Sequence, residues 1–346
     1  MPAPGSGQIT VVIPCFNAAR TLDACLRAVF DQTRRPDEVV VVNDASTDSS
    51  ATIARSFPCT LVDMPVNRGV SAARNAGVAA SDGTFLFFVD ADVALYPDAI
   101  ANALGPLAAD PTLGVVQGIF AREALVEDGP VEVYRVLHEH HWRARNVGRV
   151  GATLFSLTAI PRSVFAAAGP FDESLRDGED VEYGSRLPAE CGILMTDTVQ
   201  GRHDEVDRMG PLLREQFRRA QMLVPIAMAR RWPAGGLRAL HRRSLVTSAL
   251  AVTTLPLGWL APAALTLPLA MVLAFACADP ALASFVRRER GARFLGYFLA
   301  VHFAVHVVVG AGAVWGGVRW LAGRRLAGTG QRVAGPPVGA VPGADR

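Results

Sequence analysis

The chain has 346 residues, enough for one large domain or for two domains with an ample core. Its formal net charge is +2, and all 34 residues of the Lys and Arg class are arginine, so nothing in the charge balance predicts a nucleic-acid partner. The five cysteines are scattered and form no CxxC pair, which indicates buried thiols in a reducing compartment and not a disulfide framework. Mean hydropathy is +0.25, high for a soluble enzyme, and the apolar excess lies near the C-terminus.

Residues 1–8 carry neither a basic region nor an apolar core of the secretory type, and we expect a short disordered lead there. From residue 9 onward, apolar runs alternate with helical patterns. The expected strands are residues 9–13, 38–42, 60–62 and 84–89, and the helices between them begin near Thr21, Ser46 and Gly69. This alternation predicts an α/β domain with a mostly parallel sheet and helices on both faces. Ligands of such sheets bind beyond the carboxyl ends of the strands.

Polar side chains follow three of these strands. Asn17 comes after the first strand, Asp44 after the second, and Asp90 and Asp92 after the fourth. Two carboxylates one residue apart at a strand end can face the same ligand, and their hard oxygens suit Mg²⁺ or Mn²⁺ together with substrate phosphate. An isolated Asp-x-Asp is often only a turn that caps a strand. The coincidence of three polar strand ends favours a ligand site instead.

Four motifs occur in a characteristic order and spacing: VVIPCFNAARTLDACLRAVFDQT, VVVNDASTDSS, NRGVSAARNAG and FLFFVDADV. Together they resemble the donor half of a family 2 glycosyltransferase, and the resemblance covers residues 8–206. It implies a GT-A fold, Rossmann-like, over residues 9–206, and a nucleoside-diphosphate sugar donor, expected to be UDP-linked. One departure is Asn43, where the family often has an acidic residue, but Asp44 keeps the more informative position.

The donor residues have chemistry that agrees with this resemblance. Asp44 is suited to accept a hydrogen bond from a base N–H, and Pro14 and Phe16 are suited to wall the base. The alternatives are a helix-capping aspartate and ordinary packing at a strand end. Asn17 lies on the same strand tip and belongs to the expected donor site.

The helix that follows residues 67–69 carries Arg74 and Asn75, and an arginine there can reach the donor diphosphate, which a helix N-terminus also favours. A solvated surface arginine is the alternative. By resemblance, Asp90 lies by the ribose and the metal, and Asp92 ligates the metal directly.

A second acidic pair follows the motif GPFD, in the sequence DGEDVE at residues 177–182. This segment resembles the acceptor side of the family. Inverting sugar transfer needs a carboxylate that takes the proton of the acceptor hydroxyl, and the resemblance assigns this role to Asp180, with Glu179 as the second candidate. An acid-rich helix N-terminus is the alternative. Arg186 either holds this pair or packs elsewhere.

Several histidines lie at positions where a functional or a structural role is conceivable. His203, after a strand expected at residues 193–196, resembles a late family histidine that completes the metal or phosphate shell, although a structural role is equally open. His140 and His141 are adjacent on an expected helix and point about 100° apart, which makes a poor metal pair. We expect them at the surface or in an acceptor groove. His302 and His306 share one face of an apolar run, where helix packing is the expectation.

The segment from Gln216 to Ala220 resembles the QxxRW signature of processive polysaccharide synthases, but Ala220 replaces the tryptophan. That tryptophan would supply an aromatic platform for the acceptor sugar. Its absence favours transfer of one sugar, or a few, over long-chain synthesis.

The C-terminal part predicts membrane attachment. Residues 207–243 are expected to form an amphipathic or interfacial helical linker whose arginines precede an uncharged run, 244–278, with prolines that favour a tight transmembrane hairpin. A basic interfacial stretch follows at 279–293, then an uncharged spanning run at 294–318 and a disordered Gly- and Pro-rich tail at 327–346. The basic flanks predict a multi-pass inner-membrane protein with a cytoplasmic catalytic domain. The number of spans, two or three, and the side of the C-terminus stay open.

The expectation is therefore a membrane-anchored, metal-assisted, inverting and non-processive hexosyltransferase of cell-envelope polysaccharide synthesis. Its partners would be a nucleotide sugar, a lipid-linked or saccharide acceptor, and membrane lipids. One rival is a sugar nucleotidyltransferase, but that class needs a Gly-rich loop after the first strand, and residues 14–20 contain no glycine. The other rival is an inactive transferase-like membrane scaffold, against which the intact Asp44, Asp90, Asp92 and Asp180 argue.

Overall fold

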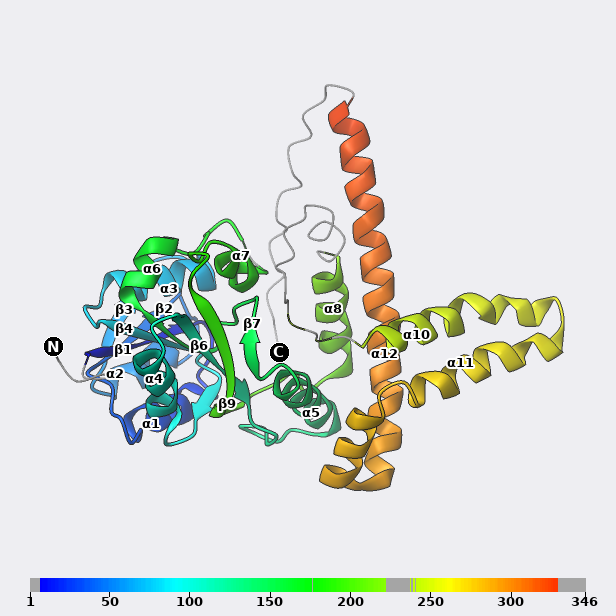
Figure 1. Cartoon of the computed structure of the whole chain (residues 1–346), viewed down its shortest axis with the longest axis horizontal. Coiled ribbons are helices and arrows are strands. Elements are labelled where there is room, and N and C mark those ends of the chain that lie inside the picture. The colour runs from blue at the N-terminus through cyan, green and yellow to red at the C-terminus, as the bar shows by residue number, and fades with distance from the viewer. Residues whose placement is uncertain (1–6, 176, 222–236, 238, 240, 329–346) are drawn as a thin grey trace.

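The computed structural model describes residues 7–175, 177–221, 237, 239 and 241–328. Figure 1 shows a sheet with helices packed on both sides, followed by a helical part in which one long helix stands beside the sheet domain. The nine strands are β1 (Ile9–Cys15), β2 (Glu38–Asn43), β3 (Thr60–Asp63), β4 (Phe85–Val89), β5 (Val93–Leu95), β6 (Leu113–Phe120), β7 (Gly148–Val150), β8 (Leu157–Pro161) and β9 (Gly192–His203).

Eight helices accompany the sheet in the described part of the chain. They are α1 (Leu22–Phe30), α2 (Ser50–Arg55), α3 (Val70–Ala79), α4 (Ala99–Ala109), α5 (Pro130–Ala144), α6 (Arg162–Ala168), α7 (Glu179–Ser185) and α8 (Met209–Ala220). The strand order is β3-β2-β1-β4-β8-β6-β9-β5, with β7 paired to β9.

The sheet is mixed, which corrects the expectation of a mostly parallel one. Strands β1 to β4 are parallel, as the alternation of strands and helices predicted. Strand β8 then runs antiparallel to both β4 and β6, and β5 runs antiparallel to β9. The chain makes a long excursion through β5, α4, β6 and α5 between β4 and β8, so no single crossover helix fixes the direction of β8.

Alternate residues of the strands build two separate cores, because successive strand side chains point to opposite faces. In β1, Val11 and Ile13 pack with α1, α2 and α4, whereas Val12 packs on the face covered by α3, α6 and α7. The first face is mainly aliphatic, built around residues such as Leu26, with Phe87 and Phe120 among its buried members. The second carries a cluster of aromatic rings around Phe88. The carboxyl ends of β1, β2 and β4 therefore meet at one edge of a rigid sheet.

A third core joins α5 and α8 to the long helix α12 (Pro280–Gly328). Gly291 interrupts α12 with φ of 80°, a backbone conformation that favours glycine, so α12 consists of two helices joined at a kink. Within the described residues, only the stretch Pro280–Ala322 is long and apolar enough to cross a membrane.

The uncharged run at residues 244–278 folds as α10 (Arg242–Thr254), two turns of 3₁₀ helix, η1 (Leu255–Trp259) and η2 (Pro262–Leu265), and α11 (Thr266–Ala276). These helices form a hairpin that projects sideways from α12 (Figure 1). With 13 and 11 residues, α10 and α11 are each shorter than the roughly 20 residues that a span needs. The expectation of several spans is therefore not supported, because the prolines break the uncharged run into short helices.

Other expectations fall outside the described residues. They concern most of the lead at residues 1–8, almost all of the tail after residue 327, and Arg230, Arg231 and Arg238 of the basic linker.

Candidate active site

The tips of β1 and β2 are joined by hydrogen bonds into one polar rim. The Asn17 side chain accepts from the backbone N–H of Thr47 at 2.8 Å, and the Asn17 backbone N–H donates to the Ser46 hydroxyl at 3.0 Å. Asn17 and Ala45 both have positive φ, 50° and 59°, a conformation that non-glycine residues rarely adopt outside special sites. Phe16 projects from this rim with 51% of its surface exposed, so its ring is free to contact a planar ligand.

Asp44 is buried at the tip of β2 and organises the loop that leads into α3. Its two carboxylate oxygens accept the backbone N–H groups of Arg68 and Gly69, each at 2.7 Å. An ionised carboxylate offers about four acceptor positions, so Asp44 retains lone pairs for a ligand. Pro14 lies buried in β1 behind this tip.

Arg74 on α3 is the centre of the site. Only 3% of its side chain is exposed, and its guanidinium pairs with Asp90 at 3.1 Å, Asp180 at 2.9 Å and Glu179 at 3.3 Å. Burial lowers the pKa of Arg74, but the three carboxylates reverse this and raise it above its usual range. Arg74 is therefore no solvated surface residue: it joins the aspartate after β4 to the acidic pair on α7.

The acidic pair lies in the first turn of α7. Asp180 is held from two sides, since its second oxygen accepts the backbone N–H of Phe155 at 3.1 Å. Glu179 makes the longer contact to Arg74, and burial together with the neighbouring Asp180 raises its pKa. Both carboxylates are ionic partners of one arginine, and Asp180 is also held by the backbone N–H of Phe155.

Asn75, a predicted donor residue, and Arg186, whose role the sequence left open, hold the surrounding chain and do not join the central cluster. Asn75 exchanges hydrogen bonds with the backbone of Phe171, at 2.9 and 3.0 Å, and contacts Glu173. Arg186 pairs with Glu182 at 2.7 Å and donates to the carbonyl of Ala168. Arg186 therefore packs against α6 and its own helix, and Arg74 holds the acidic pair instead.

Asp92 and His203 meet because β5 pairs with β9, which places Val93 opposite His203. The His203 Nε2 atom lies 3.5 Å from Asp92 Oδ2. Burial lowers the pKa of His203, but the carboxylates of Asp92 and Glu205 outweigh it and raise the pKa well above its usual range. The pairing of β5 with β9 thus brings together two of the predicted metal ligands.

These residues fit a Mg²⁺ or Mn²⁺ ion that shares its coordination with substrate. Among the described residues, no three His, Cys, Asp or Glu side chains are grouped closely enough to hold a metal by themselves. Mg²⁺ is usually bound through one or two carboxylates plus phosphate oxygens and water, so a complete protein cage is not required. Asp92 Oδ1 is buried and has no hydrogen-bond partner in the described part of the chain, which is the feature expected of an unused ligand atom.

A group of residues behind His203 was not foreseen from the sequence. Glu205, Arg135, Glu139 and Arg143 form buried ion pairs, and Phe120 stacks on the His203 ring. The signal was the spacing of Arg135, Glu139 and Arg143 at i, i+4 and i+8, which places three charges on one helix face. Such a stripe usually lies in water, and only the tertiary structure reveals that it is buried.

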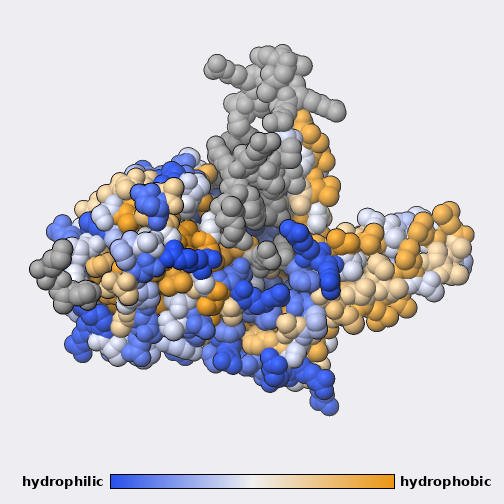
Figure 2. Space-filling view, viewed as in Figure 1, coloured by the Kyte–Doolittle hydropathy of each residue, from blue (hydrophilic) through white to orange (hydrophobic). Residues whose placement is uncertain are grey.

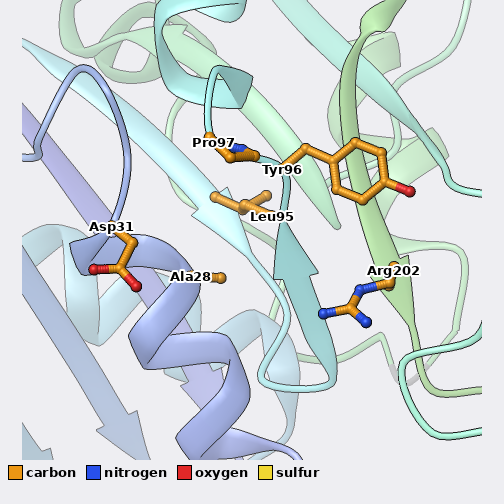
Figure 3. Close-up of a pocket in the computed structure, with 6 residues that line it drawn as sticks. All are labelled: Ala28, Asp31, Leu95, Tyr96, Pro97 and Arg202. Carbon is orange, nitrogen blue, oxygen red and sulfur yellow. The ribbon is translucent and has the colours of Figure 1, made fainter.

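A separate hollow of about 460 Å³ is lined by Ala28, Asp31, Leu95, Tyr96, Pro97 and Arg202 (Figure 3). None of the residues predicted from the sequence lines it. Arg202 precedes His203 on β9 and points to the opposite face of the strand. The donor and acid residues therefore do not belong to this hollow.

Comparisons with known proteins agree with the geometry. Residues 10–147 match the family model described as glycosyl transferase family 2. The validoxylamine A glucosyltransferase of Streptomyces hygroscopicus subsp. limoneus is 31% identical over 234 residues, covering 56% of this chain and 51% of that protein. A glycosyltransferase of Escherichia coli K12 named YibD is 33% identical over 116 residues, covering 32% of this chain and 33% of that protein. The chain thus spans a third to about half the length of these relatives.

Among solved structures, the mannosyltransferase PcManGT of Pyrobaculum calidifontis, in complex with GDP-Man and Mn²⁺, is similar in fold. Its TM-score is 0.56 at 23% identity, and the similarity covers 91% of this chain and 89% of that one. Strand order, motif positions and these matches lead to one conclusion. Over residues 10–147 the chain is similar to glycosyl transferase family 2, and its sheet domain has a GT-A-like mixed sheet with flanking helices.

Proposed function

We propose that this chain is an inverting, metal-assisted glycosyltransferase that uses a UDP-linked sugar. The observation that carries the proposal is the buried Arg74, which joins Asp90 on the donor side to Asp180 on the acceptor side at 3.1 and 2.9 Å. One arginine therefore fixes the distance between the two halves of a transfer reaction. Such positioning is a large part of what a transferase has to supply.

The donor would lie across the tips of β1, β2 and β4. Phe16 would stack on the base, Asp44 would accept a base N–H, and Asn17 would line the rim. Asp92 and His203, with Asp90 beside them, would hold Mg²⁺ or Mn²⁺, and such an ion supplies positive charge that neutralises the departing diphosphate. Asn75 and Arg74 would act by holding the walls of this site in place.

Asp180 would take the proton of an acceptor hydroxyl. The acceptor oxygen then attacks the anomeric carbon, a new C–O bond forms on the face opposite the leaving group, and the bond between the anomeric carbon and the diphosphate oxygen breaks. The nucleoside diphosphate leaves with that electron pair. The backbone N–H of Phe155, 3.1 Å from Asp180, would keep the base aimed during this exchange.

Transfer would be limited to one sugar, or a few. Ala220 is 3% exposed and packs against α12, where a β-carbon added to Gly312 would lie 2.9 Å from the Ala220 β-carbon. A tryptophan has no room at this position. No aromatic platform is therefore supplied there for a growing polysaccharide.

We also propose a membrane location, with α12 as a single anchor and a membrane-bound acceptor. Beyond the kink at Gly291, residues 292–322 of this stretch extend about 46 Å at 1.5 Å per residue, more than the roughly 30 Å hydrocarbon thickness of a bilayer. One part of this helix can pack on α5 while another faces lipid. Val314, Trp315, Val318 and Leu321 are all half exposed or more.

The hairpin of α10 and α11 supports the same location. Figure 2 shows apolar residues covering it, and at its tip Trp259 and Leu260 are 93% and 84% exposed. The hydroxyls of Thr247, Ser248, Thr253, Thr254 and Thr266 all donate to carbonyls three or four residues earlier in the chain. Groups that satisfy themselves in this way need no water, which suits contact with lipid.

The test is a turnover screen. Full-length protein in detergent is incubated with Mn²⁺ and a panel of UDP- and GDP-sugars, and released nucleoside diphosphate is measured. We expect release from at least one UDP-sugar, and a drop of 100-fold or more in Asp92→Asn, which removes a ligand charge but keeps the shape. No release from any nucleotide sugar, with or without candidate acceptors, would contradict the proposed function.

A further inference from the structure

Behind His203 lies a closed ring of buried side chains, which we call the His203 ring. It contains His203, Glu205, Arg135, Glu139, Arg143 and Phe120. His203 Nδ1 lies 3.1 Å from Glu205 Oε1, and the other Glu205 oxygen accepts from Arg135 Nε at 3.3 Å. The contacts continue along α5 and return to the imidazole through Phe120, which stacks on its face.

The return path consists of two ion pairs and two ring contacts. Arg135 pairs with Glu139 at 2.9 Å, and Glu139 pairs with Arg143 one helical turn further on. The Arg143 guanidinium lies 4.0 Å from the centre of the Phe120 ring. Phe120 in turn stacks on His203, with 4.1 Å between ring centres and 14° between planes. Stacking on Phe120 therefore fixes the orientation of the imidazole plane, and Glu205 fixes the rotation of the imidazole within that plane.

The four ionised groups behind His203 balance one another in charge and are buried. The side chains of Arg135, Glu139 and Arg143 are 8–11% exposed, and that of Glu205 is 6% exposed. Burying four ionised groups gains little net stability compared with packed apolar residues. These groups instead orient the imidazole. The ionised Glu205 carboxylate can only accept hydrogen bonds, so the His203 Nδ1 atom must be the donor. The Nε2 atom is then the one that faces Asp92.

We infer that Glu205 is a positioning residue for the proposed metal site: it presents His203 Nε2 toward Asp92, and Arg135 on α5 holds Glu205 in place. The inference rests on the proposed function, since it gives His203 a ligand role. Carboxylates that orient a metal-binding histidine from behind commonly change metal affinity by 10- to 100-fold when removed.

The experiment measures Mn²⁺ binding to full-length protein in detergent, with saturating UDP and no turnover, from the electron paramagnetic resonance signal of free Mn²⁺. We expect Glu205→Ala to raise the Mn²⁺ dissociation constant 10- to 100-fold. Glu205→Gln should raise it only a few-fold, because its amide oxygen still accepts from Nδ1. If the alanine variant folds poorly, the Glu205→Gln variant still allows the Mn²⁺ dissociation constant to be compared with that of wild type.

A double-mutant cycle distinguishes positioning from simple structural support. If Glu205 acts through His203, then His203→Ala alone and His203→Ala with Glu205→Ala should bind Mn²⁺ equally weakly. Tyr134→Phe is the matched control, since it removes a 3.1 Å contact from α5 to His302 outside the His203 ring. Its Mn²⁺ dissociation constant should stay within twofold of wild type.

Three results would overturn the inference: an unchanged dissociation constant in folded Glu205→Ala, an unchanged constant in His203→Ala, or additive losses in the double variant. Failure of the proposed function looks different. Wild-type protein would then bind Mn²⁺ and UDP and respond to Glu205→Ala as expected, but would turn over no nucleotide sugar.

Discussion

Arg74 shows how one buried charge can organise a site. Its guanidinium is the only described cation within ion-pair distance of Asp90, Glu179 or Asp180, which would otherwise repel one another. Three carboxylates gathered around one arginine carry excess negative charge. This excess suits a site that would bind a metal ion and take a proton from an acceptor hydroxyl.

Replacement of Arg74 by glutamine should therefore destabilise the fold in a pH-dependent way. The three carboxylates would lose their counter-charge, and the pKa values of Asp90 and Glu179, which burial already raises in the folded state, would rise further above the unfolded ones. The cost, about 3–5 kcal/mol at pH 8, should shrink toward pH 5, because protonation of the carboxylates relieves it. Thermal unfolding with a chelator at both pH values measures this.

Arg55→Gln is the matched control, since Arg55 and its partner Asp63 are 59% and 47% exposed. A change within about 0.5 kcal/mol is expected there. If Arg74→Gln behaves like this control, or loses the same stability at both pH values, Arg74 is not the centre of the site.

Sequence and structure agree best where a motif is local. The polar tips after β1, β2 and β4 lie at one sheet edge, as the pattern of parallel strands predicted. Arg74 was expected to point at a diphosphate, but the acids that bind it, Glu179 and Asp180, are more than 100 residues away in sequence. No local pattern could reveal that pairing.

At the scale of elements, the contact between α8 and α12 depends on close backbone approach. A β-carbon at Gly312 would lie 2.6 Å from the Phe217 carbonyl oxygen, and one at Gly316 would lie 2.1 Å from that of Gln221. Small residues four apart create the flat helix surface that permits this. The same contact buries Ala220, so it also bears on the expected product length.

Gly312→Ala should loosen this contact even though alanine favours helices. We expect a loss of about 1–3 kcal/mol from overpacking. Gly310→Ala is the control on the same helix, because a β-carbon there meets nothing within 4 Å. It should be neutral or stabilising by up to about 1 kcal/mol. Equal effects of the two variants, measured by thermal unfolding, would argue against tight packing at Gly312.

Direction and burial of whole elements were the features that the sequence did not reveal. Strand β8 carries the same apolar signature whichever way it runs, so its antiparallel pairing with β4 came only from the structure. Helix α5 carries the charged residues Arg135, Glu139 and Arg143, a pattern typical of a solvent-facing helix surface, yet the His203 ring buries all three. Hydropathy patterns report local polarity, and burial of paired charges is a tertiary property.

At the scale of the molecule, the helical part offers two apolar surfaces, α12 and the hairpin of α10 and α11 (Figure 2). Apart from Arg242 and Arg243 at its start, the hairpin carries no charge, and it exposes many aliphatic side chains, which a soluble protein rarely does over a contiguous area. With the single span that we propose for α12, the hairpin is free to lie in the membrane interface.

Acidic residues at the hairpin tip should therefore weaken membrane association. The double change Trp259→Asp with Leu260→Asp places two charges where the chain is most exposed, so we expect a smaller pelleted fraction with vesicles of bacterial lipid. Val147→Asp, at a site 43% exposed on the transferase part, is the matched control and should pellet like wild type. Equal pelleting of all three would mean that the tip does not enter lipid.

In the proposed mechanism, donor binding and proton removal reside in different groups that Arg74 joins. The most direct measurement compares UDP binding with sugar transfer in Asp180→Asn, using calorimetry with Mn²⁺ for the first and product formation for the second. We expect UDP affinity within a few-fold of wild type and transfer reduced by at least 1,000-fold, with Glu179→Gln retaining most transfer. Transfer that survives in Asp180→Asn, or UDP binding lost together with it, would contradict this division of roles.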